Sequence, residues 1–142
     1  MRVHLCRHAE AAPGEPDALR TLTAAGVAQA HALGARLRSS EAPPTVVLTS
    51  PLLRARQTAE AIGRELDVPV LADTRLAPGA TAASLAEALV GLVGPVAAVG
   101  HQPDCSHIAV ELTGSDPGFP VAGSAELDVV VDAGAAFEDG AP

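Results

Sequence analysis

Short apolar runs alternate with longer segments of helical periodicity along most of the chain. The runs are rich in Val, Leu or Ala, a composition typical of strands that are buried on both faces of a parallel sheet. They cover residues 3–7, 45–49, 68–71 and 95–99. A further run, residues 126–132, alternates less clearly and is interpreted as an edge strand. The pattern therefore predicts four buried strands and a fifth one at an edge.

Helices are predicted between these strands, over residues 23–38, 51–66, 81–92 and 104–112. Two start signals support them. Thr23 is predicted as an N-cap, and Ser50-Pro51 places an N-cap before a proline in the first helical position. Strands that alternate with helices at this spacing imply right-handed crossovers. We therefore expect an α/β fold: a single-domain three-layer sandwich with a mainly parallel central sheet and helices on both faces.

The length and composition agree with that fold and exclude several functions. The 142 residues predict one domain over residues 1–142, with residues 134–142 as a flexible tail. All nine basic residues are Arg, and with seventeen Asp and Glu they give a net charge of −8. This charge argues against general binding to nucleic acids or anionic membranes, because both require excess positive charge. The scarcity of aromatic residues also argues against base stacking.

Cysteine usage and hydropathy predict the compartment. Cys6 and Cys105 are too few for a disulfide framework, and the chain opens without a signal-peptide pattern. No run approaches the roughly 18 apolar residues of a membrane span. We therefore expect a cytoplasmic protein, and the oligomeric state stays open.

Four side chains that can carry positive charge follow three of the predicted strands. Arg7 and His8 end the first strand, Arg54 lies in the first turn of the helix after the second, and His101 follows the fourth. Ligands of such sheets bind outside the carboxyl ends of the parallel strands, so we expect these residues to share one site. Their approach is costly unless an anion is bound, and a helix N-terminus beside Ser50 favours the same anion. Phosphate is the predicted ligand, because the planar fork of Arg binds two of its oxygens.

The residues around these positions form three ordered motifs. They read Leu5-Cys6-Arg7-His8-Ala9-Glu10, Ser50-Pro51-Leu52-Leu53-Arg54-Ala55-Arg56-Gln57-Thr58-Ala59 and Val99-Gly100-His101. With them, the chain resembles the histidine phosphatase superfamily over residues 1–132, and it is most similar to the small bacterial phosphohistidine phosphatases of the SixA type. Further shared positions are Leu22, Thr23, Gly26, Leu76 and Pro78.

This resemblance implies a site and a reaction. His8 is the nucleophile that accepts the phosphoryl group, Arg7 and Arg54 clamp its oxygens, and His101 completes the pocket. Arg20, close to the shared Leu22-Thr23, is a further candidate for substrate binding. No metal or other cofactor is implied. The expected partner is a phosphate-bearing substrate, namely a protein that carries phosphohistidine, and the pathway stays open.

One departure from the mutase-like members of the superfamily bears on the substrate. Those relatives supply an acidic proton donor after the third strand, whereas residues 75–82 of this chain contain no carboxylate. An alcohol leaving group requires a proton. A phosphoramidate is less demanding, because solvent can protonate its ring nitrogen, which then departs as neutral imidazole. Phosphohistidine therefore fits better than a sugar phosphate, and Glu10, Asp17, Asp104 and solvent remain open as proton donors.

Two other functions share these residues: a phosphomonoesterase for a small phosphorylated metabolite, and a module that binds phosphate or phosphohistidine without turnover. A zinc site is a weaker alternative, drawn from Cys6, His8, His101, Cys105 and His107. Its spacing matches no familiar zinc pattern, and Arg7 and Arg54 would repel the ion. His4 and Cys6 are expected to pack against a helix, and His31 to face solvent or a partner.

Overall fold

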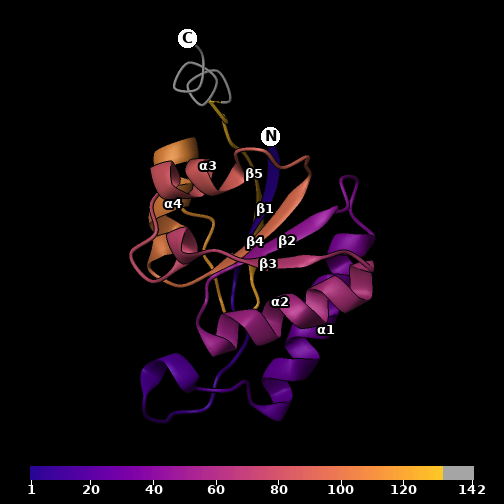
Figure 1. Cartoon of the computed structure of the whole chain (residues 1–142), viewed down its shortest axis with the longest axis vertical. Coiled ribbons are helices and arrows are strands. Elements are labelled where there is room, and N and C mark those ends of the chain that lie inside the picture. Colours follow the sequence, from indigo (N-terminus) through magenta and orange to yellow (C-terminus); the bar gives the residue numbers. More distant parts are fainter. Residues whose placement is uncertain (133–142) are drawn as a thin grey trace.

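A five-stranded sheet forms the centre of the computed structural model, which describes residues 1–132 (Figure 1). The strands are β1 (Arg2–Arg7), β2 (Val46–Thr49), β3 (Val70–Ala72), β4 (Val96–Gly100) and β5 (Ser124–Asp128). Their order in the sheet is β3-β2-β4-β1-β5. The first four pair in parallel, and β5 pairs antiparallel with β1 at the edge. The mainly parallel α/β sheet that the sequence predicts is confirmed.

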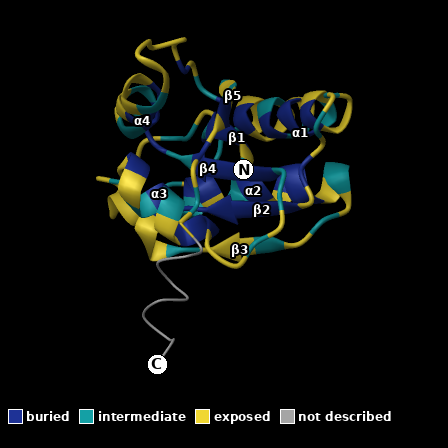
Figure 2. Ribbon diagram, turned by 90° about the horizontal axis from the view of Figure 1, so that it is seen from above, coloured by how far each residue is buried: buried dark blue, intermediate teal, exposed yellow. Residues whose placement is uncertain are grey.

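Helices cover both faces of the sheet and complete the three predicted layers. Two lie on one face, α1 (Ala24–Arg38) and α2 (Leu53–Leu66), and two on the other, α3 (Ala82–Leu89) and α4 (Asp104–Thr113). Figure 2 shows β1, β2 and β4 mostly buried between these helices, whose outer surfaces are exposed. The prediction of a fourth buried strand is wrong, because β3 lies at an edge of the sheet and is mostly exposed. The connections contain two 3₁₀ turns, η1 (Asp17–Leu19) and η2 (Thr74–Leu76). No described helix is long enough and apolar enough to cross a membrane.

Each face of the sheet has its own core, because successive strand residues point to opposite faces. In β2, Val46 and Leu48 pack with α3 and α4, whereas Val47 packs with α1 and α2. In β1, Leu5 packs on the side of α3 and α4, and Cys6 on the side of α1 and α2. Cys6 is fully buried there, so it packs against a helix as expected. The strands are thus fixed from both sides, which fixes their carboxyl ends as well.

The start of α1 is locked against the segment that leaves β1. Thr23 is the N-cap, as predicted, and its side chain accepts a hydrogen bond from the Gly26 backbone N–H at 2.9 Å. A Cβ at Gly26 would lie 2.1 Å from the Glu10 carbonyl oxygen, so only glycine allows this approach. The residues just after His8 are therefore held directly on the first turn of α1.

The start of α2 differs from the prediction. The helix begins at Leu53 rather than at Pro51, and its N-cap is Leu52, which makes no side-chain cap. The Ser50 hydroxyl still accepts a hydrogen bond from the Leu52 N–H at 3.2 Å, but it also contacts the His101 ring at 2.7 Å. Ser50 is therefore part of the candidate site, and the helix begins after it.

Three other boundaries shift by a few residues. The third helix ends at Leu89 rather than at 92, because Val90 is extended and Gly91 has a φ of +85°. The third strand covers Val70–Ala72 rather than residues 68–71. The fifth covers Ser124–Asp128 rather than residues 126–132. The predicted tail over residues 134–142 lies outside the described residues.

Candidate active site

The four residues singled out by the sequence meet at the carboxyl edge of the sheet. Arg7 ends β1 and His8 follows it, His101 follows β4, and Arg54 lies in the first turn of α2, which follows β2. Because β4 lies between β2 and β1, these three ends are neighbours. The His8 and His101 rings lie 5.3 Å apart between centroids and are tilted by 59°. Residues that are distant in the sequence thus form one cluster.

His8 is held with one ring nitrogen committed and the other available. Its Nδ1 lies 2.7 Å from the Ala9 carbonyl oxygen, and a carbonyl can only accept, so Nδ1 carries the hydrogen. In the neutral ring this arrangement leaves the lone pair on Nε2. Burial lowers the pKa of His8 below its ordinary value, and the charges of Arg54, Arg7 and Arg20 lower it further, against the Ala9 hydrogen bond. His8 is therefore a neutral imidazole at neutral pH.

His101 is the second histidine of the cluster, and its two ring nitrogens also differ in their surroundings. Its Nε2 lies 2.7 Å from the Ser50 hydroxyl oxygen, and its Nδ1 is buried with no hydrogen-bond partner. Burial lowers the pKa of His101 to about 4, with further lowering by the nearby His8 and by the charge of Arg54. The ring is neutral, and when Ser50 donates to Nε2, Nδ1 carries a hydrogen that no protein group accepts.

The two arginines of the cluster also retain unpaired donors. Arg7 donates from Nη1 to the Phe119 carbonyl at 3.1 Å, and Arg54 donates from Nη1 to the Asp17 carbonyl at 2.9 Å. In both residues Nε is buried and has no partner. The backbone carbonyl of Arg54 is fixed by the Thr58 hydroxyl at 2.8 Å.

These unpaired atoms are concentrated at one place. In residues 1–132, the buried side-chain nitrogen and oxygen atoms that lack a partner are Arg7 Nε, Arg54 Nε and His101 Nδ1. Buried polar groups are nearly always paired, so three unpaired nitrogens on residues of this edge are unusual and single it out as the candidate site.

Arg20 lies farther out, at the rim. It donates from Nε to the Ala12 carbonyl at 2.9 Å and from Nη1 to the Asp17 carboxylate at 3.2 Å. Its side chain is 29% exposed, whereas that of Arg54 is 8% exposed. The charge of Arg20 still lowers the pKa of His8, so it contributes to the field of the site from its entrance.

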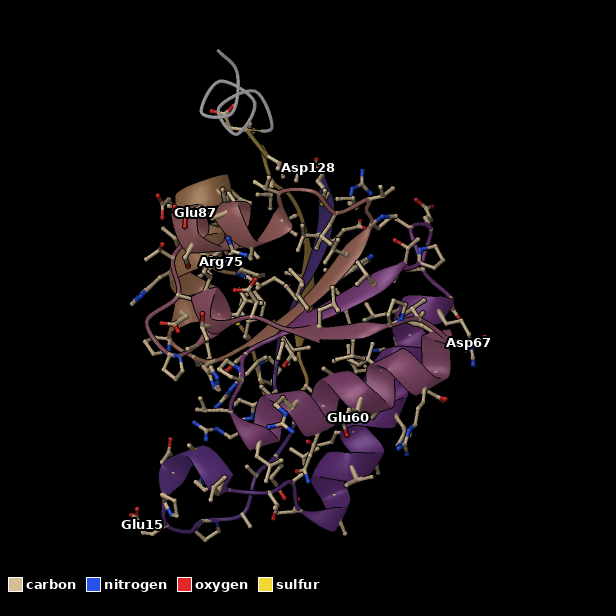
Figure 3. All side chains as sticks on the ribbon, in the orientation of Figure 1. Glu15, Glu60, Asp67, Arg75, Glu87 and Asp128 are labelled. Atoms are coloured by element: carbon tan, nitrogen blue, oxygen red, sulfur yellow. The ribbon has the colours of Figure 1, made fainter. Side chains whose placement is uncertain are left out.

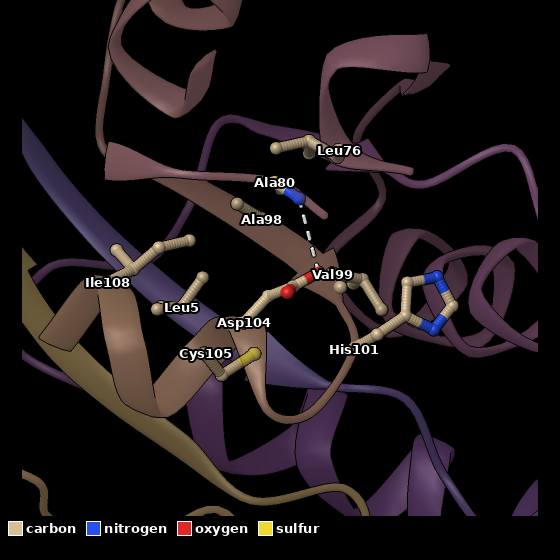
Figure 4. A pocket seen from close by; sticks show the side chains of 10 residues that line it. Leu5, Leu76, Ala80, Ala98, Val99, His101, Asp104, Cys105 and Ile108 are labelled. Carbon is tan, nitrogen blue, oxygen red and sulfur yellow. Dashed lines mark hydrogen bonds between the residues drawn. The ribbon is translucent and has the colours of Figure 1, made fainter. Parts of the chain in front are cut away.

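Each of the three carboxylates considered as proton donors is engaged elsewhere. Asp104 Oδ2 accepts from the Gly79 and Ala80 N–H groups at 2.8 and 3.2 Å, beside a small apolar pocket (Figure 4). Glu10 Oε1 accepts from the Thr23 hydroxyl at 2.7 Å. Asp17 lies between Arg20 and Arg54, and its pKa is lowered mainly by the hydrogen bond from Arg20.

Of these three, Asp17 alone bonds to an arginine of the cluster. Its lowered pKa keeps it ionised, so it is a poor proton donor.

The residues of the alternative zinc site do not come together in the described part of the chain. Among the described residues, no group of three or more His, Cys, Asp or Glu side chains is placed to hold a metal ion. Cys6 and Cys105 pack in opposite cores of the sheet, and burial raises the pKa of the Cys105 thiol to about 12. His107 is exposed on α4, and His31 is half-buried in a groove of about 140 Å³ between α1 and α2.

Sequence reasoning missed several contributors to the cluster. The sequence predicts Ser50 as a helix cap, although its place directly after a strand points to the same edge as His101. Thr58 follows Arg54 by one helical turn and also accepts from the Ala9 N–H at 3.0 Å. The Phe119 carbonyl carries no sequence signal, because any residue supplies the same oxygen.

An α/β sheet whose carboxyl edge presents a neutral imidazole among guanidinium groups is the arrangement expected of a protein that binds or transfers phosphoryl groups. The family model of the histidine phosphatase superfamily (branch 1) matches residues 3–78. The chain belongs to this superfamily, and the resemblance in its sequence motifs is confirmed. No curated protein matches the chain.

Solved structures agree with this assignment. The protein histidine phosphatase SixA, complexed with tungstate, is 28% identical with a TM-score of 0.80, over 89% of this chain and 86% of that one. The putative phosphohistidine phosphatase SixA from Agrobacterium tumefaciens is 33% identical with a TM-score of 0.76, over 89% and 90% of the two chains. A mycobacterial glucosyl-3-phosphoglycerate phosphatase, 21% identical with a TM-score of 0.69 over 89% and 90%, shares the fold.

Proposed function

We propose that this protein is a phosphatase that removes the phosphoryl group from phosphohistidine on another protein, through a covalent phospho-His8 intermediate. The observation that carries the proposal is the set of three unpaired buried nitrogens around a neutral His8. Membership of the histidine phosphatase superfamily and the likeness to SixA structures support the same reaction class.

The first step of the reaction follows from the tautomer of His8. Its Nε2 lone pair attacks phosphorus in line, a new N–P bond forms, and the P–N bond of the substrate breaks. The departing imidazole takes a proton from solvent. The second step is attack by water on phospho-His8, which releases inorganic phosphate and restores the neutral ring.

The remaining residues act by position and charge. Arg7, Arg54 and His101 donate to the phosphoryl oxygens, whose charge shifts as the transferring group passes between the two nitrogens. Phosphoryl transfer demands little covalent chemistry from a protein beyond such preorganised donors. Arg20 binds substrate at the entrance, where its side chain is partly exposed.

The leaving group decides between the candidate substrates. Asp17 is ionised and bonded to two arginines, Asp104 is bonded to backbone N–H groups, and Glu10 is bonded to the Thr23 hydroxyl, so each of the three candidate acids already has a partner. An imidazole leaving group tolerates this arrangement, because its nitrogen is protonated by water. An alkyl phosphate does not, because its alkoxide needs a proton as it leaves.

The test compares three substrates. Wild type and His8→Ala are assayed with a phosphohistidine peptide, phosphoramidate and an alkyl phosphate such as glycerol 3-phosphate. We expect wild type to prefer the two P–N substrates and His8→Ala to be inactive on all three. A preference for phosphate esters would instead identify a metabolite phosphomonoesterase, and phosphate binding without any turnover would identify a silent binding module.

A further inference from the structure

Asp17 joins two arginines at the rim of the site. Its Oδ2 accepts from Arg54 Nη2 at 3.2 Å, and its Oδ1 accepts from Arg20 Nη1 at 3.2 Å. Its backbone carbonyl also accepts from Arg54 Nη1 at 2.9 Å. A single residue therefore holds both terminal nitrogens of the buried guanidinium group.

The Arg54 guanidinium group is paired at one end and unpaired at the other. Asp17 accepts one N–H of Nη1 and one N–H of Nη2, whereas Nε is buried without a partner in the chain. Since the guanidinium is a rigid plane, fixing its terminal nitrogens also fixes the direction of the Nε–H bond. We propose that Asp17 is a positioning residue that orients Arg54 for a phosphoryl oxygen. The inference rests on the proposed function of Arg54.

The turn that carries Asp17 is anchored on both sides. The Ala12 N–H donates to the Thr21 carbonyl at 2.8 Å, and Arg20 Nε donates to the Ala12 carbonyl at 2.9 Å. The Leu22 N–H donates to the Gln57 side chain at 2.8 Å, which ties the end of the segment to α2. Asp17 thus acts on Arg54 from a fixed support rather than from a free loop.

Charge supports the same role. Three guanidinium groups, of Arg7, Arg20 and Arg54, face two neutral imidazoles and the ionised Asp17. The group therefore carries two net positive charges, which match a phosphoryl group of about two negative charges. Asp17 also lies between Arg20 and Arg54 and reduces the repulsion between them.

The experiment measures tungstate affinity at equilibrium, and kcat and KM on phosphoramidate, for Asp17→Asn and Asp17→Glu. Glu15→Gln is the matched control, because it removes one negative charge at the outer end of the same segment (Figure 3). Loss of a charged hydrogen bond predicts roughly tenfold weaker tungstate binding for Asp17→Asn, and an equal or larger fall in kcat/KM. Asp17→Glu restores part of the affinity, Glu15→Gln changes it by less than about twofold, and thermal midpoints show that the variants fold.

A double-mutant cycle shows whether Asp17 acts through Arg54. In an Arg54→Ala background, Asp17→Asn is expected to cause no further loss of tungstate affinity. The proposal is overturned by tighter binding in Asp17→Asn, by an equal loss in Glu15→Gln, or by a full additional loss in the Arg54→Ala background. If Arg54→Ala itself binds tungstate like wild type, the proposed phosphate clamp fails instead, so the two failures are distinguishable.

Discussion

Strand β1 has one buried histidine near its start and another just beyond its end, and the two are paired differently. His4 Nε2 donates to the Ala42 carbonyl at 2.7 Å, and the Glu126 carboxylate lies 3.7 Å away. His8 Nδ1 donates to the Ala9 carbonyl at 2.7 Å, which leaves the lone pair on Nε2. His4 is thus satisfied within the protein, whereas His8 keeps a reactive atom.

The two histidines also differ in the polar groups that surround them. The three buried side-chain nitrogens that lack a partner in residues 1–132 lie at the His8 end of the sheet. An unpaired buried donor costs about 1–3 kcal/mol. An anion that accepted these bonds would remove this cost. Burial of a histidine therefore does not identify a site, but unpaired donors around a buried histidine do.

The largest expected effect separates the two histidines by activity. His8→Ala removes the nucleophile, so we expect turnover of phosphoramidate by the folded variant to fall by roughly a thousandfold or more. Steady-state assays measure the turnover, and thermal melting shows that the variant folds. A variant that keeps even about a tenth of wild-type activity excludes His8 as the nucleophile, since loss of a nucleophile is far more damaging.

The next effect concerns the donors around His8. Arg54→Lys keeps the positive charge but loses Nε and the planar fork, so we expect kcat/KM to fall by about a hundredfold to a thousandfold. Arg56→Lys is the matched control, because Arg56 is exposed on the same helix. Equal activity of Arg54→Lys and wild type would mean that charge alone, without directed donors, binds the phosphoryl group.

A smaller effect is expected at His4, and on stability instead of activity. His4→Ala leaves the Ala42 carbonyl without its donor and opens a cavity, so the free energy of unfolding should fall by about 2 kcal/mol or more. Urea unfolding measures the change. If His4→Ala loses more activity than its unfolded fraction explains, the two ends of β1 are not independent.

The smallest effect is on the pH profile. The pKa of His8 is lowered, so the neutral ring persists below its ordinary pKa of 6.5, and the acid limb of kcat/KM should lie below pH 6.5. Arg20→Gln removes one of the charges that lower the pKa of His8 and should move this limb to higher pH. A limb above pH 6.5 in wild type would contradict the neutral-nucleophile account.

Most of the fold could be predicted from the sequence, because it depends on the pattern of apolar and polar positions and not on particular side chains. Apolar runs alternate with helical periodicity, and Thr23 caps its helix as its side chain suggests. Boundaries were less predictable where a local cause competes. Ser50 contacts His101 instead of acting as the N-cap of α2, and Gly91 ends the third helix through its positive φ.

The central residues of the site were predictable for a different reason. His8, Arg54 and His101 each follow a parallel strand, so the topology alone brings them to one edge. Their supports were not predictable, since they depend on side-chain directions. The hydrogen bond from Arg54 to Asp17 joins residues that are 37 positions apart in the sequence. A backbone carbonyl such as that of Phe119 has no signature in the sequence.

The covalent intermediate is tested most directly by trapping it. Wild type is mixed with labelled phosphoramidate, quenched in alkali, digested and mapped by mass spectrometry. We predict one labelled phosphate on the peptide that contains His8, stable in alkali, lost in acid, and missing from His8→Ala. Continued turnover with no label on His8, or with the label on another residue, would contradict the account.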